Sequence, residues 1–128
     1  MLVPITGIYV ALLALLGLAL QQHVGRERLR AGISLYHGDD ESLAVAMRRQ
    51  ANFVEQVPIA LLLLAVLELN GAGALWLHSL GSALLVARVV HPFGLEMHDF
   101  KRMPRLIGAV GTLLVVLLAS GKALWLAF

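Results

Sequence analysis

Apolar residues gather in four long segments of this chain, and polar residues separate them. The segments cover residues 2–20, 53–70, 74–90 and 105–128. Lys122 interrupts the fourth segment near its end. At about 1.5 Å per residue, each segment is long enough to form a helix that crosses a bilayer. The first has no basic residue before it and no small-residue cleavage site after it, so it is interpreted as a retained helix rather than a signal peptide.

Local signals at the segment ends place the helix boundaries more closely. The acidic cluster Asp39-Asp40-Glu41-Ser42 suits a helix N-terminus, and no breaker separates it from the second apolar segment. Asn70-Gly71-Ala72-Gly73 has the composition of a tight turn, and His91-Pro92 should end the third helix. Pro104 suits the first turn of the fourth helix. The sequence therefore predicts helices at about residues 2–30, 40–70, 73–91 and 104–127.

The composition agrees with a membrane protein. Hydrophobic residues make up 59% of the 128 residues and charged residues 14%, whereas soluble domains are about half apolar and a quarter charged. We predict one all-α domain over residues 1–128, an antiparallel bundle of four transmembrane helices. With no cysteine there is no disulfide framework and no cysteine nucleophile, and the scattered histidines predict no metal site. A net charge of +2 is too small to indicate nucleic-acid binding.

Two of the three connections carry most of the charge. The first has arginines at 26, 28, 30, 48 and 49, and the third has Lys101 and Arg102, while the short second connection has none. In a four-helix chain the first and third connections lie on the same side of the membrane. The positive-inside rule makes this side cytoplasmic and places both termini outside.

The most informative polar residues lie where the second apolar segment begins. Arg48, Asn52 and Glu55 are spaced by four and then three, so they share one face of a helix. One interpretation is an internal ion pair between Arg48 and Glu55, bridged by Asn52. The other is a binding site for a zwitterion, in which Arg48 takes a carboxylate and Glu55 takes an ammonium group or a backbone amide. The cost of an unpaired carboxylate at a membrane helix favours the binding site.

Three other basic groups allow two interpretations each. Arg88 and His91 share a helix face and are either interface anchors or part of a site. The run from Lys101 to Arg105 is either a lipid-headgroup anchor or, through Arg105 at a helix N-terminus, a site that stabilises a thiolate. The run from Arg26 to Arg30 is a solvated or headgroup-facing helix end with a second possible role as a carboxylate clamp.

These motifs resemble those of the MAPEG family, the membrane-associated proteins in eicosanoid and glutathione metabolism, which include microsomal glutathione transferases. The pattern Arg48-x-x-x-Asn52-x-x-Glu55-x-x-Pro58 at the entry to the second helix carries the resemblance. Ala87-Arg88-Val89-Val90-His91 resembles the family's third helix more loosely. The short chain and simple connections are similar to the bacterial branch, which implies a bacterial inner membrane.

The resemblance implies a homotrimer with glutathione bound as a co-substrate between adjacent subunits near the cytoplasmic side. By this likeness the glutathione-binding residues would be Arg26 or Arg28, Arg48, Asn52, Glu55, Arg88 and His91. Arg105, or Arg102 under a different alignment through Pro104, would face the glutathione sulfur. Some members have a tyrosine one turn beyond the third-helix histidine, whereas this chain has Phe93-Gly94-Leu95 there.

The expected activity is that of a glutathione transferase or peroxidase acting on lipophilic molecules from the bilayer. The alternative is a membrane protein of the same fold that holds glutathione or a lipid without chemistry.

Overall fold

A computed structural model describes residues 2–99 and 102–128, so the predicted anchor residue Lys101 lies outside the described residues. It contains four long helices, α1 (Pro4–Ala31), α2 (Glu41–Leu69), α3 (Ala74–Val90) and α4 (Met103–Ala127). A 3-10 turn, η1 (His91–Gly94), extends α3. All four helices are long and apolar enough to cross a membrane, which confirms the predicted all-helical transmembrane architecture.

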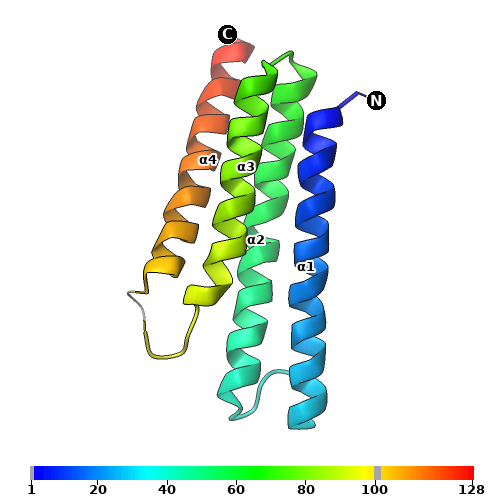
Figure 1. Ribbon diagram of the computed structural model, residues 1–128, viewed down its shortest axis with the longest axis vertical. Helices are drawn as coiled ribbons and strands as arrows, with labels where there is room; N and C mark the ends of the chain where they lie inside the picture. Colours follow the sequence, from blue (N-terminus) through cyan, green and yellow to red (C-terminus); the bar gives the residue numbers. More distant parts are fainter. Residues whose placement is uncertain (1, 100–101) are drawn as a thin grey trace.

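The helices run alternately up and down (Figure 1). The α2–α3 turn and both termini lie at one end of the bundle, and the two charged connections lie at the other. Helices α1 and α4 each pack against both α2 and α3. The side of the membrane that each end faces stays a prediction.

A single apolar core fills the bundle, with Leu13, Leu64 and Leu84 among its fully buried side chains. Many large apolar side chains point outward, including Leu15 on α1 and Leu117 on α4. A water-soluble protein rarely exposes so much contiguous apolar surface, whereas lipid or a partner helix would cover it. Outward apolar faces and a narrow buried core are therefore what a membrane bundle requires.

Two glycines let the helices approach closely. A Cβ atom on Gly81 of α3 would collide with the ring of Tyr9, and one on Gly108 of α4 would collide with His91. The Tyr9 hydroxyl bonds to His78 Nδ1 at 3.0 Å and to Ser82 Oγ at 2.9 Å, so α1 is tied to α3 at this level. These contacts set the depth and rotation of α1 and α4 against α3.

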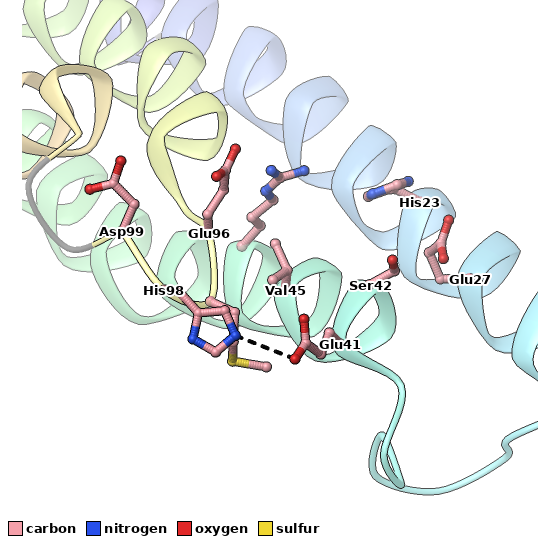
Figure 2. A pocket seen from close by; sticks show the side chains of 10 residues that line it. His23, Glu27, Glu41, Ser42, Val45, Glu96, His98 and Asp99 are labelled. Carbon is pink, nitrogen blue, oxygen red and sulfur yellow. Dashed lines mark hydrogen bonds and ion pairs between the residues drawn. The ribbon is translucent and has the colours of Figure 1, made fainter.

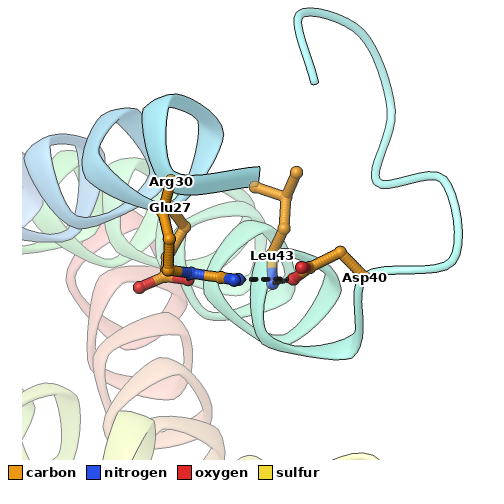
Figure 3. Close-up of polar contacts among 4 residues, drawn as sticks. All are labelled: Glu27, Arg30, Asp40 and Leu43. Carbon is orange, nitrogen blue, oxygen red and sulfur yellow. Dashed lines mark hydrogen bonds and ion pairs between the residues drawn. The ribbon is translucent and has the colours of Figure 1, made fainter. Parts of the chain in front are cut away.

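The first connection is held by charged side chains at the start of α2 (Figure 3). Asp40 is the N-cap, and its carboxylate accepts the Leu43 N–H at 2.8 Å. Arg30 of α1 donates to Asp40 at 2.7 Å and to Glu27 at 2.7 Å. The Leu43 amide first, and then the Arg30 guanidinium, hold the pKa of Asp40 below its ordinary value. The acidic cluster seen in the sequence thus supplies both a helix cap and an ion pair.

Candidate functional site

A cavity of about 330 Å³ opens between α2, η1 and α4 at the end of the bundle that carries the charged connections. We call it the arginine cavity. Four of the residues predicted from the sequence line it, namely Arg48, Asn52, His91 and Arg105. Its remaining lining residues are Ala44, Val45, Leu95, Glu96 and Met97. Two guanidinium groups, an amide and an imidazole from three elements therefore converge on one space.

Arg48 and Glu55 form an ion pair along the face of α2. Arg48 Nη1 and Nη2 donate to the two carboxylate oxygens at 3.2 and 2.9 Å. The side chains are 57% and 48% exposed, and such exposed pairs contribute only about 0–1 kcal/mol. The internal ion pair considered for this spacing is thus formed in the free chain, and it is weak enough for a ligand carboxylate to compete for Arg48. Glu55 itself does not line the arginine cavity.

Arg88 is placed differently from the other predicted ligands. It lies in the last turn of α3, is only 2% exposed, and does not line the arginine cavity. Its Nη1 donates to Asn52 Oδ1 and its Nη2 to the carbonyl oxygen of Gly108, each at 2.9 Å. Arg88 instead lines a narrow cavity of about 170 Å³ together with Asn52 and His91, both of which also line the arginine cavity.

His91 and Arg105 form the wall of the arginine cavity opposite α2. His91 is 5% exposed at the first position of η1, and its ring forms no hydrogen bond within the described residues. Gly94, which ends η1, lies directly against the backbone of Arg105. Arg105 is half-buried in the first turn of α4, where the free N–H groups and the helix dipole also favour an anion.

The two predicted arginines of α1 lie elsewhere. Arg26 and Arg28 line a separate surface cavity formed by the end of α1 and the chain after it. Arg28 Nη1 donates to three carbonyl oxygens of that chain, those of Ile33, Ser34 and Tyr36, at 3.4, 3.1 and 2.9 Å. The guanidinium of Arg28 is therefore committed to holding the connection. Arg26 is exposed and makes no hydrogen bond or ion pair within the described residues.

The sequence did not predict a second cavity of about 520 Å³ (Figure 2), which shares part of its lining with the arginine cavity. We call it the acidic cavity. It shares Val45, Glu96 and Met97 with the arginine cavity, and its other lining residues are His23, Glu27, Glu41, Ser42, Arg49, His98 and Asp99. Arg49 donates to the carbonyl oxygen of Leu95 at 3.0 Å. These residues come from distant stretches without a shared spacing, so no sequence signal marks them.

The arginine cavity presents positive charge and several hydrogen-bonding groups. Arginine provides donors only, and an asparagine amide adds one donor group and one acceptor. No serine, threonine, tyrosine or cysteine is among the lining residues, so the cavity itself offers no hydroxyl or thiol group. Within the described residues, no three histidine, aspartate or glutamate side chains group to hold a metal ion.

Comparison with known proteins finds relatives of this chain. A family model described as the MAPEG family matches residues 6–125. The inner membrane protein YecN of Escherichia coli K12 is 32% identical over 97 residues, which cover 76% of this chain and 74% of YecN. YecN of the O6:H1 strain CFT073 matches with the same identity and coverage. No solved structure is matched.

Proposed function

Since this chain belongs to the MAPEG family, we propose that it binds glutathione in the arginine cavity and uses the thiolate to attack lipophilic molecules that enter from the membrane. The convergence of Arg48, Asn52, His91 and Arg105 on one cavity carries the proposal. The name of the relative YecN supports a place in the inner membrane.

The charges of the cavity complement those of glutathione. A glutathione carboxylate would replace Glu55 as the partner of Arg48, because the existing pair is exposed and weak. The displaced Glu55 carboxylate would then be available to the ligand ammonium group. Asn52 would contact the peptide backbone, and His91, whose ring has no partner among the described residues, would add a further hydrogen bond.

In this proposal Arg105 stabilises the thiolate. Its guanidinium and the N-terminus of α4 both place positive charge beside the cavity, and nearby positive charge lowers the pKa of a thiol. The sulfur would attack an electrophilic carbon, forming a thioether as the leaving group departs with its electron pair. With a hydroperoxide, the sulfur would attack the terminal oxygen and break the O–O bond, which forms the sulfenic acid of glutathione and releases an alkoxide that takes a proton from water to become the alcohol. A second glutathione would convert the sulfenic acid to a disulfide and water.

The proposed assembly is a homotrimer in which a neighbouring copy closes the cavity. Of the two α1 arginines, Arg26 is the better candidate to reach a neighbour's ligand, because Arg28 already donates to three carbonyl oxygens of its own connection. Arg26 is exposed and has no partner within the described residues.

The alternative is a binder that holds glutathione or a lipid without chemistry. One observation favours it: no side chain that lines the arginine cavity carries a hydroxyl group. Calorimetry with glutathione together with conjugation and peroxidase assays separates the two functions. Binding without turnover across several electrophiles would support the binder, and no glutathione binding would refute both.

The test of the thiolate role compares Arg105→Ala with Arg102→Ala in the purified protein. Arg102→Ala is the matched control, because it also removes one guanidinium. Arg102 pairs with Glu96 and does not line the arginine cavity. We expect Arg105→Ala to raise the pKa of the bound thiol and to slow conjugation, and Arg102→Ala to change both much less. Unchanged turnover in Arg105→Ala would remove Arg105 from the mechanism, and the reverse ranking would assign the role to Arg102.

A further inference from the structure

Arg88 is the most deeply buried charged side chain of the described residues, and it lies beside the arginine cavity without facing it. It is 2% exposed within a single chain, and a narrow cavity of about 170 Å³ that it lines with Asn52 and His91 is its one described opening. No carboxylate lies within ion-pairing distance among the described residues, and the two acceptors of its hydrogen bonds are neutral oxygens. A buried cation with no paired anion is costly, so its position calls for a role that a hydrocarbon side chain could not fill.

The first contact of Arg88 decides how Asn52 is oriented. A guanidinium has donors only, so the atom of Asn52 that faces Arg88 Nη1 has to be the acceptor Oδ1. The amide NH2 group of Asn52 then points away from Arg88. Because Asn52 also lines the arginine cavity, the cavity is offered a donor at this point and not an acceptor. Without Arg88, either end of the amide could face the cavity.

The second contact of Arg88 fixes the helix that carries Arg105. Its Nη2 bonds to the carbonyl oxygen of Gly108, one turn after Arg105 on α4. The Thr112 hydroxyl donates to the same oxygen at 2.8 Å. Gly108 has no side chain, which lets this turn of α4 lie directly against His91. One guanidinium on α3 therefore links the Asn52 wall of the arginine cavity to the Arg105 wall.

We propose that Arg88 is a positioning residue, which directs the NH2 group of Asn52 into the arginine cavity and holds Arg105 at a set distance across from it. The consequence of this inference rests on the proposed function. In that function, the NH2 group of Asn52 donates to a carbonyl or carboxylate oxygen of glutathione. It gives Arg88 an indirect role at the site in place of the expected direct contact with glutathione.

The orientation of Asn52 can be observed without any ligand. The chain has two asparagines, Asn52 and Asn70, so asparagine-specific isotope labelling gives two side-chain amide signals in NMR spectra. Asn70 lies at the opposite end of the bundle, where its Nδ2 donates to Val66, and it is the internal reference. We expect Arg88→Lys, which keeps the charge but lacks the planar fork that reaches the two partners from two nitrogens, to shift the Asn52 signal and leave that of Asn70 in place. Identical Asn52 signals in both proteins would overturn the inference.

The consequence for binding is tested by a double-mutant cycle on glutathione affinity. We expect Arg88→Lys to weaken binding roughly tenfold, and the same change to have little further effect in the Asn52→Ala protein. Asn52→Asp keeps the acceptor for Arg88 but removes the donor, so it should weaken binding at least as much as Asn52→Ala. Equal losses from Arg88→Lys with and without the Asn52 amide would overturn the inference.

The two kinds of failure are distinguishable. If wild-type protein does not bind glutathione, the proposed function fails while the Asn52 signal still reports whether Arg88 orients the amide. The Asn70 signal and the elution profile on size exclusion report whether Arg88→Lys keeps the fold. Should Arg88→Lys lose the fold, Asn52→Asp against Asn52→Ala still tests the direction of the amide, and tighter binding by Asn52→Asp would refute it.

Discussion

The carboxylate of Glu68 holds the N-terminus of α1 from the far end of α2, which makes it a sharp test of the bundle. Its two oxygens accept the backbone N–H groups of Ile5 and Thr6 at 2.8 and 2.7 Å. No side chain of α1 caps this end, where Pro4 stands in the first turn. The first N–H groups of a helix have no partner within the helix, so in a membrane the supply of acceptors from α2 matters.

We expect Glu68→Gln to lower the free energy of unfolding by about 2 kcal/mol. The amide keeps one acceptor oxygen and turns an NH2 group toward the second N–H. The loss of one hydrogen bond to a charged acceptor costs about 1.5–3 kcal/mol, and the lost attraction to the helix dipole costs about 0.3–1 kcal/mol. Because Glu68 is only half-buried, water replaces part of the lost bond and the lower end of the combined range applies.

The assay is reversible unfolding in mixed detergent micelles, with amide hydrogen exchange at Ile5 and Thr6 as the local measurement. Glu41→Gln is the matched control, since Glu41 pairs with His98 at 3.3 Å and both side chains are largely exposed. The control should change the free energy of unfolding by less than about 0.5 kcal/mol. Equal effects of the two substitutions, with unchanged exchange at Ile5 and Thr6, would refute the role of Glu68.

Three further predictions concern packing, pH and the first connection. Gly81→Ala should lower the free energy of unfolding by about 1–3 kcal/mol because its methyl group collides with a tyrosine ring, whereas Gly121→Ala, in open space, should not lower it. The low pKa of Asp40 adds stability that is complete above about pH 4 and is lost as the pH falls through that lowered pKa, so Asp40→Asn should flatten the acid limb of unfolding curves. Arg28→Met should speed proteolysis of the connection after α1 and leave glutathione affinity nearly unchanged, whereas Arg26→Ala should weaken binding; the opposite pattern would make Arg28 the ligand residue.

The features that the sequence predicted correctly depend on local patterns. Four membrane-length apolar segments indicate four helices, because in lipid each segment has to satisfy its own backbone hydrogen bonds. The matching family model confirms the MAPEG resemblance drawn from the motif around Arg48 and Asn52. The spacing also placed Arg48, Asn52 and Glu55 on one helix face, since that follows from the helical period alone.

The roles of individual side chains depended on how the helices pack. Spacing allowed Arg48 and Glu55 to be either a pair or two ligands, and the structure forms the pair. Nothing in the local sequence of Arg28 showed that its guanidinium would be taken up by its own connection. Glu68 reaches an N-terminus more than 60 residues away along the chain.

The sequence by itself determined a four-helix membrane bundle, its family and the residues from which a site could be built. Only the tertiary structure decided that Arg88 is enclosed between Asn52 and Gly108 while Arg105 faces the arginine cavity. The reason is physical: helical period sets which residues share a face, but the rotation and depth of each helix decide where that face points. In this bundle those two quantities are set by contacts between helices, such as the close approach at Gly108.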